Sequence, residues 1–200
     1  MRADVVSYLF AGAGRKKKLQ FQIVFQCAPL LKGMKRASLM SVEEDCLEEL
    51  KAIFSHTGIR CRLLGLCRGR ALVLCCRESE LEEYVNRPEI RRFLASYGYG
   101  GDGISDFLDR LSGRMERYMA QKGEFPHEIG VFLDYPLEDV RGFIGNGGKN
   151  CFLSDYWKVY DNPSKAQLMF WVYDQAKCSA VNEFLAGKSV REIMKVNRNG

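Results

Sequence analysis

The spacing of apolar residues along the chain predicts a fold in which helices predominate. In several segments apolar residues recur every three or four positions, as in a helix that buries one face. Proline in a first turn and glycine after a last turn mark several of the ends. The predicted helices lie between Ser41 and Gly58, from Ser79, from Pro88 to Gly98, up to Gly123, over about 126–133 and 136–145, from Asn162 to Gly187, and from Ser189.

Three of these helices follow a serine that stands three residues before a glutamate. In a capping box the serine and glutamate side chains each accept a hydrogen bond from a backbone N–H of the first turn. The pattern therefore predicts where these helices begin. The pairs are Ser41 with Glu44, Ser79 with Glu82, and Ser189 with Glu192.

Strand patterns are fewer than helical ones. Residues 59–77 predict a β-hairpin that turns at Arg68-Gly69-Arg70, and the continuous apolar run Ala71–Cys76 suits a strand covered on both faces. A further strand is predicted over Cys151–Tyr160, after a glycine-rich loop at 145–150. Residues 19–31 fit either a strand or a helix.

These elements together predict an α+β fold. A small, mainly antiparallel sheet of about three to five strands packs against a majority of helices. The composition, 46% apolar and 28% charged, excludes a disordered or fibrous chain. No apolar run approaches the roughly 18 residues that cross a bilayer, so we expect no membrane insertion.

Positive charge is concentrated near the N-terminus. The first 36 residues carry a formal charge of +7 and the remainder −2. We therefore predict a flexible basic N-terminal arm over 1–18 and a single globular α+β domain over 19–196. The arm offers nucleic acid a contact surface, but short basic runs are more often solvated tails, so we do not expect nucleic acid as a partner.

The cysteines indicate a reducing compartment. None of the eight forms a C-x-x-C pair, and several lie in apolar patterns where free cysteine behaves as a small buried hydrophobe. The apolar stretch Val5–Phe10 is too short for a signal peptide. We expect a cytoplasmic protein with reduced thiols that needs no metal and no cofactor.

Several motifs match a functional pattern only in part. Gly98–Gly103 reads G-x-G-x-x-G but follows a helix, whereas a dinucleotide site requires a preceding strand. His127-Glu128 resembles the start of a zinc-protease helix, yet Val131 stands where the second histidine belongs. The helices at 126–133 and 136–145 have helix-turn-helix spacing, but Glu138 and Asp139 begin the second and would repel phosphates.

Catalytic candidates are limited to thiols and one histidine. Cys27 or Cys151 with His127 would form a nucleophile and base if the fold brought them together, because a neighbouring imidazole favours the thiolate. The sequence itself gives no sign that they meet.

A ligand-binding surface is the preferred alternative. Strand alternation over 156–160 places Tyr156, Lys158 and Tyr160 on one face, and Trp157 and Val159 on the other. The glycine-rich loop ends in a lysine that suits a small anion. The full candidate set is His127, Glu128, Lys149, Asn150, Tyr156, Lys158 and Tyr160.

Four segments carry a resemblance to a known family. They are 126–130 (PHEIG), 135–140 (YPLEDV), 142–144 (GFI) and 156–160 (YWKVY). With these segments the chain resembles domain-of-unknown-function family 3793 of anaerobic Gram-positive bacteria, from about Cys27 to beyond Tyr173. The resemblance implies a bacterial cytoplasmic protein and no particular activity. The chain departs from the family pattern at Gln26, where a histidine often stands, and at Asp134, where a glycine does; the first departure weakens a histidine–cysteine site.

We therefore expect a non-catalytic binding or regulatory domain with an unknown small-molecule or protein partner. The alternatives are a thiol-dependent enzyme that uses a cysteine with His127, and a nucleic-acid binder that uses the basic arm.

Overall fold

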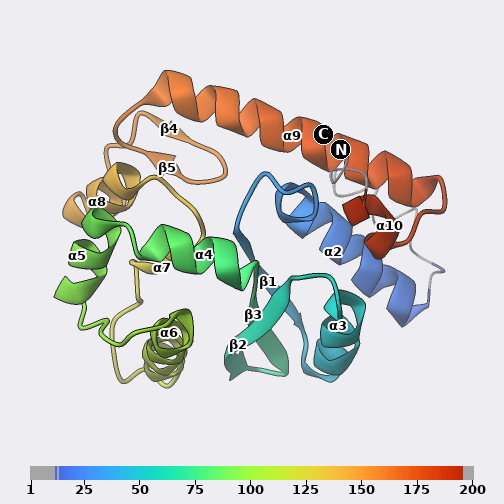
Figure 1. Ribbon diagram of the computed structural model, residues 1–200, viewed down its shortest axis with the longest axis horizontal. Coiled ribbons are helices and arrows are strands. Elements are labelled where there is room, and N and C mark those ends of the chain that lie inside the picture. Colours follow the sequence, from blue (N-terminus) through green and yellow to red (C-terminus); the bar gives the residue numbers. More distant parts are fainter. Residues whose placement is uncertain (1–11, 13, 196–200) are drawn as a thin grey trace.

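The computed structural model describes residue 12 and residues 14–195, and it confirms the α+β class (Figure 1). A three-stranded antiparallel sheet lies between two groups of helices, and a two-stranded hairpin lies apart from it. The elements are α2 (Arg15–Leu31), β1 (Ala37–Glu43), a 3-10 turn (Glu44–Cys46), α3 (Leu47–Phe54), β2 (Arg60–Cys67), β3 (Arg70–Cys76), α4 (Glu78–Val85), α5 (Pro88–Ser96), α6 (Ile104–Met119), α7 (Ile129–Phe132), α8 (Leu137–Gly145), β4 (Leu153–Ser154), β5 (Lys158–Val159), α9 (Pro163–Leu185) and α10 (Val190–Lys195).

The main sheet has the order β1-β3-β2, with the apolar strand β3 in the centre. The predicted hairpin is confirmed, and Arg68 and Gly69 form its turn with φ angles of 50° and 72°. Two successive positive φ angles give the turn a twist that matches the strands it joins. Strand β1 pairs with the other edge of β3, and the periodicity of the sequence did not predict this strand.

Alternation along the strands divides the core in two. Met40 and Val42 of β1 face a first core, formed with α2, α3, the C-terminal half of α9, and α10. Ala37 and Leu39 face a second core, formed with α4, α5, α6, α7 and α8. Because successive side chains of a strand point to opposite faces, the sheet separates the two cores.

Residues 19–31 are helical, which settles the alternative that the sequence left open. Helix α2 buries Leu19, Ile23 and Leu30 against the sheet and α9. The last four residues of the predicted arm, 15–18, form the first turn of this helix, so the boundary drawn after residue 18 falls inside α2. Residues 1–11 and 13 lie outside the described residues.

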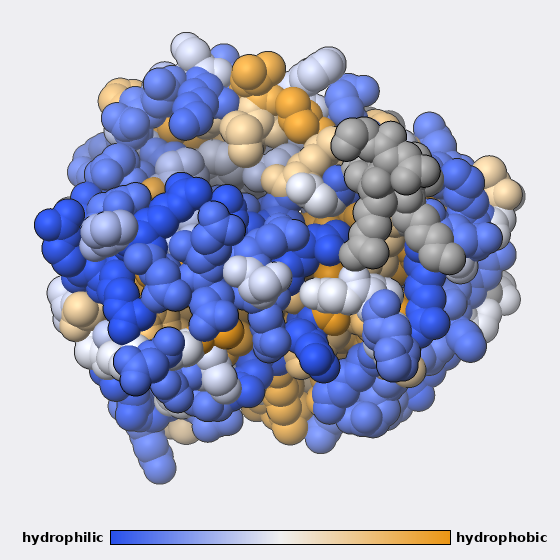
Figure 2. Space-filling model, in the orientation of Figure 1, coloured by the Kyte–Doolittle hydropathy of each residue, from blue (hydrophilic) through white to orange (hydrophobic). Residues whose placement is uncertain are grey.

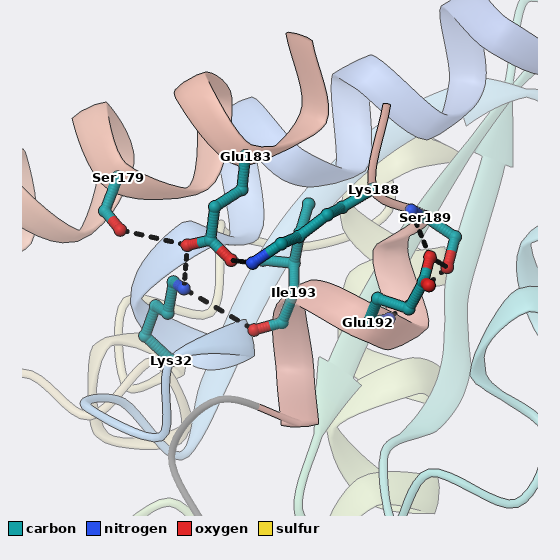
Figure 3. Close-up of polar contacts among 7 residues, drawn as sticks. All are labelled: Lys32, Ser179, Glu183, Lys188, Ser189, Glu192 and Ile193. Carbon is teal, nitrogen blue, oxygen red and sulfur yellow. Dashed lines mark hydrogen bonds and ion pairs between the residues drawn. The ribbon is translucent and has the colours of Figure 1, made fainter. Parts of the chain in front are cut away.

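The three capping predictions have different outcomes. The pair Ser189 and Glu192 forms the expected box: the Ser189 backbone N–H donates to Glu192 Oε2 at 2.8 Å, and the Glu192 N–H donates to Ser189 Oγ at 3.3 Å (Figure 3). Ser41 is not a cap, because pairing with β3 extends β1 to Glu43. The Ser79 prediction is wrong because α4 begins at Glu78, which places Ser79 inside the helix, and Glu82 instead accepts the Ile104 N–H at 3.2 Å.

The single strand predicted over 151–160 is also wrong. The chain forms β4 and β5, which pair Leu153 with Val159 and Ser154 with Lys158. A tight turn at 155–157 reverses the chain, so the alternation that the prediction assumed is interrupted there.

Helix α9 connects the two ends of the molecule. Its 23 residues extend about 34 Å at 1.5 Å per residue. The first half covers the β4–β5 hairpin, and the second half packs on α2 (Figure 1). As predicted, Asn162 caps it, accepting the Lys165 N–H at 3.0 Å. Figure 2 shows a largely hydrophilic face with apolar side chains along the first half of α9, where Leu168 and Trp171 are exposed.

An ion pair holds α2 to the second half of α9. Lys32 Nζ lies 2.5 Å from Glu183 Oε1 and 3.5 Å from the Ile193 carbonyl of α10 (Figure 3). Burial alone would raise the pKa of Glu183, but hydrogen bonds from Lys32, Lys188 and Ser179 lower it below its ordinary value. The carboxylate therefore stays charged, and Lys32, which contacts both Glu183 and the Ile193 carbonyl, links the end of α2 to α9 and α10.

Candidate ligand-binding site

A cavity of about 310 Å³, here called the ligand pocket, lies between the α7–α8 helix pair and the β4–β5 hairpin. Its buried inner wall is apolar apart from the Asp139 carboxylate, and His127, Ser154 and Asp155 are exposed at its mouth. The full lining is Leu39, Phe125, His127, Ile129, Gly130, Leu133, Tyr135, Asp139, Val140, Phe143, Ser154, Asp155, Trp157 and Lys158.

The helix pair that forms one wall corresponds to the helices predicted over about 126–133 and 136–145. Its turn places Asp134 at a φ of 63°, a conformation that favours glycine. Here Asp134 is held by Arg36, whose backbone N–H donates at 3.1 Å and whose guanidinium donates at 2.5 Å.

Asp139 of α8 fixes the opposite wall. Its buried carboxylate accepts the Trp157 Nε1–H and the Tyr160 N–H, both at 2.7 Å, and the Asp161 N–H at 3.0 Å. These three donors come from the hairpin and from the residues that lead into α9. A carboxylate that accepts several N–H groups gains charge-assisted hydrogen bonds in place of its lost hydration.

Close packing around α8 completes this wall. The Tyr160 ring lies directly on Gly142, where an added Cβ would overlap the tyrosine Cβ and Cγ atoms. The Trp157 ring stacks on Tyr135, with centroids 5.4 Å apart, and meets Phe170 of α9 edge-on. Trp157 and Val159 are buried, as the sequence predicted.

Two of the predicted ligand-binding residues line the pocket together. The His127 ring lies between Phe125 and Phe143, 5.1 Å from the centroid of each. The Lys158 ammonium donates to the Gly148 carbonyl at 2.6 Å and lies 5.8 Å from the centroid of the Phe143 ring. A cation and an imidazole therefore lie beside an apolar cavity.

The other predicted residues lie elsewhere. Glu128 is fully buried behind the pocket, 2.5 Å from Arg114 Nε, and accepts the Tyr99 hydroxyl at 2.8 Å. Tyr156 turns toward α9 and donates to Asp174 at 2.9 Å, so it does not share a face with Lys158. Lys149 and Asn150 are exposed outside the lining.

The structure does not bring the proposed nucleophile and base together. Cys27 belongs to the first core, where its thiol lies 3.7 Å from Met40 Sδ. His127 lines the pocket with Leu39, the neighbour of Met40 in β1, whose side chain points to the other face of the sheet. The sheet thus lies between Cys27 and His127, and Cys151 is not among the residues that line the pocket.

The remaining motifs have structural roles. The Gly98–Gly103 segment connects α5 to α6, as its helical context predicted. Within the described ranges, one cluster of acidic and sulfur ligands is close enough to hold a metal ion: Glu43, Asp45 and Cys46. Arg15 occupies it with ion pairs to both carboxylates and a hydrogen bond to the sulfur, which anchors the start of α2.

Comparison with known proteins agrees with the family resemblance. Residues 23–194 match the family model described as "Protein of unknown function (DUF3793)". The chain belongs to this family. The match covers the second core, the ligand pocket and the first core except Leu19 and Phe21, so the pocket is made by the family domain itself. The chain matches no curated protein and no solved structure. No helix among the described residues has the length and apolarity to cross a bilayer.

Asp139 was missed as a site residue because its charge suggested an exposed position. One sequence signal was available: Asp139 stands beside Val140 and one helical turn before Phe143, at the border of the apolar face.

A test of the role of Asp139 compares it with Glu138, its exposed neighbour. Asp139→Ala leaves three N–H donors without their acceptor and should lower the free energy of unfolding by about 3 kcal/mol or more.

Glu138→Ala removes only an exposed pair with Arg141 and should cost no more than about 0.5 kcal/mol. Denaturant unfolding of the two variants measures the difference. Equal losses would show that the Asp139 hydrogen bonds do not hold the pocket wall.

Lys35 lies behind the pocket, with Nζ 4.9 Å from the centroid of the Tyr135 ring. Burial lowers the pKa of its ammonium to about 8, against the opposing influence of Asp134. Below a pH of about 8 the Lys35 amine is charged in the folded and in the unfolded protein alike, so folding bears the full cost of removing this charge from water. Between pH values of about 8 and 10.5 the amine is neutral in the folded protein but still protonated in the unfolded chain. The free energy of unfolding therefore rises with pH over this range, until the cost of burying the charge has disappeared.

Lys35→Met should therefore raise the free energy of unfolding near neutral pH by about 2 to 3 kcal/mol, since one pKa unit corresponds to about 1.4 kcal/mol. The gain should shrink as the pH rises through 8 toward 10.5. Unfolding curves at several pH values test this, with exposed Lys149→Met as the control. If the gain in the free energy of unfolding of Lys35→Met does not change with pH, burial of the charged amine is not what destabilises the folded protein.

Proposed function

We propose that this chain is a non-catalytic binding or regulatory domain of a bacterial cytoplasmic protein, and that it holds a small amphipathic molecule in the ligand pocket. The apolar body of the ligand lies against Trp157 and Val140, and its anionic group meets Lys158. The observation that carries the proposal is an apolar cavity of about 310 Å³ with one half-buried ammonium group in its lining.

The size and lining of the pocket support a small molecule. Ligand sites are typically cavities of about 300 to 1,000 Å³ with mostly apolar walls and a few placed polar groups. A cavity of about 310 Å³ suits a body of up to three rings or a short acyl chain. Rings already border it on several sides, from Phe125, Tyr135, Phe143 and Trp157.

The charges favour an anionic group on the ligand. An ammonium group has three donors, and Lys158 gives one of them to Gly148, which leaves two for a ligand. Its neighbour Phe143 limits hydration and strengthens any ion pair made there. The lining also carries two carboxylates. Three N–H donors offset the charge of Asp139, and Asp155 lies at the exposed mouth, where water screens its charge.

The same geometry supports binding without catalysis. Both oxygens of Asp139 are engaged by backbone and indole N–H groups, so this carboxylate is not available as a base. No cysteine is among the residues that line the pocket, and Cys27 lies across the sheet from His127. None of the eight cysteines is joined in a disulfide in the structure, which supports the proposed cytoplasmic setting.

Two dyes that share one body test the proposal. Anilinonaphthalene sulfonate carries an anionic group, and N-phenyl-1-naphthylamine has the same rings without it. In a Trp171→Phe background, Trp157 is the remaining tryptophan and reports binding from inside the pocket. We expect both dyes to change its emission, and the sulfonate to bind more tightly.

Lys158→Met keeps the aliphatic stem and removes the charge. It should weaken sulfonate binding about tenfold, or 1.4 kcal/mol, and leave the affinity for the neutral dye within about twofold. Lys149→Met is the matched control outside the pocket. If neither dye alters Trp157 emission, the pocket is not a binding site; if both lose affinity equally in Lys158→Met, the anionic group is wrongly placed.

A further inference from the structure

The side chains of Cys27, Cys75 and Cys61 all belong to the first core, on the side of the sheet away from the ligand pocket. Cys61 of β2 and Cys75 of β3 are direct partners in the antiparallel register, with their sulfur atoms 3.6 Å apart. Cys27 of α2 also lies close enough to raise the pKa of the Cys75 thiol. Cys75 and Cys27 are fully buried, whereas Cys61 is only partly buried.

Cys61 lies beside a second cavity, which is open to solvent and has a volume of about 540 Å³. Strand β2 is at the edge of the sheet, so this side of the strand is not covered by another strand among the described residues. Lys51, Arg60 and Arg62 line the cavity, with Glu78 as its one acidic residue. Each cation also has an exposed or half-exposed ion-pair partner, Glu48 for Lys51, Glu78 for Arg60 and Asp109 for Arg62. Exposed ion pairs are weak, so these cations can exchange their partners for a small anion in the cavity, here called the basic cavity.

The two paired thiols have different environments. Cys61 is the thiol of this pair that a disulfide in solution can reach, because it is partly exposed and lines the basic cavity. The neighbouring thiols of Cys27 and Cys61, together with burial, raise the pKa of Cys75 well above its ordinary value. Cys75 therefore stays protonated as long as Cys61 carries no attached group. Because Cys75 is fully buried beside Cys61, its sulfur can react only with a group attached to Cys61.

We propose that Cys61 is a thiol–disulfide exchange site for small disulfides that carry carboxylates, and that Cys75 resolves the mixed disulfide. The Cys61 thiolate attacks one sulfur of the small disulfide, which forms a mixed disulfide and releases one small thiolate. Cys75 then attacks the Cys61 sulfur, its proton passes to the second leaving thiolate, and a Cys61–Cys75 disulfide results. Two protein thiols are oxidised, and one small disulfide is reduced to two thiols.

The backbone accommodates this product without rearrangement. Directly opposed residues of an antiparallel pair have Cα atoms about 4.5 to 5.5 Å apart. Disulfides span Cα separations of about 4.4 to 6.8 Å, so the paired register lies within their range. The bond would join β2 to the central strand β3, and small thiols would reverse it.

Glutathione disulfide and the neutral 2-hydroxyethyl disulfide, added separately to the reduced full-length chain, test the proposal. Intact mass and peptide mapping over time follow each cysteine. We expect a product that has lost two hydrogens, with Cys61 linked to Cys75. In Cys75→Ser a glutathionyl group should instead persist on Cys61. Cys67 of the same strand is exposed and has no thiol within hydrogen-bonding reach among the described residues, so any adduct there should persist in both proteins.

Arg60→Glu tests the basic cavity. It should slow the reaction of Cys61 with glutathione disulfide severalfold and leave the rate with the neutral disulfide unchanged. A persistent adduct on Cys61 in the unmodified chain, a disulfide between other cysteines, or modification of Cys61 no faster than of Cys67 would overturn the exchange site. Equal rates for Arg60→Glu and the unmodified chain would overturn the role of the cavity.

Discussion

The buried carboxylate of Asp139 is the interaction on which the ligand pocket depends. Its three N–H donors come from Trp157, Tyr160 and Asp161, which lie on either side of β5 and before α9. The two-stranded hairpin has only two paired positions and no extended sheet to support it. A single acceptor on α8 therefore determines how far the hairpin lies from the helix, and the space left between them is the pocket.

The central strand β3 imposes the second constraint, because it is covered on both faces. Ala71, Val73 and Cys75 face the first core, and Leu72, Leu74 and Cys76 face the second. The sheet therefore distributes the reactive groups to two sides: the thiols of Cys27, Cys61 and Cys75 on one, and His127 with the ligand pocket on the other. A thiol–imidazole pair does not form, whereas binding and thiol exchange remain separate and independently testable properties.

The elements that sequence analysis predicted correctly are those with strong local signals. Arg68-Gly69 specifies a tight turn by itself, Ala71–Cys76 is apolar enough to be a central strand, and Asn162-Pro163 begins α9 as expected. The serine–glutamate pairs show the limit of such signals. Ser189 caps its helix, but Ser41 has the same pattern and lies in a strand, because pairing with β3 outweighs the local preference of a few residues.

The candidate site was predicted only in part, for the same reason. Alternation correctly placed Trp157 and Val159 in the core, yet the turn at 155–157 sends Tyr156 to α9 and leaves Lys158 at the pocket. Leu39 and Phe125 reach the pocket from distant parts of the chain, and no spacing along the sequence records that contact. The acceptor role of Asp139 depends on donors about 20 residues away along the chain, so its local pattern showed only an acidic helix start.

A crystal structure of the chain with anilinonaphthalene sulfonate would test the binding proposal most directly. The account predicts the rings of the dye between α8 and the β4–β5 hairpin, in contact with Trp157 and Val140. It also predicts a sulfonate oxygen about 2.8 Å from Lys158 Nζ, the usual length of a charge-assisted hydrogen bond. Dye bound on the exposed face of α9, around Leu168 and Trp171, with none in the ligand pocket, would contradict it.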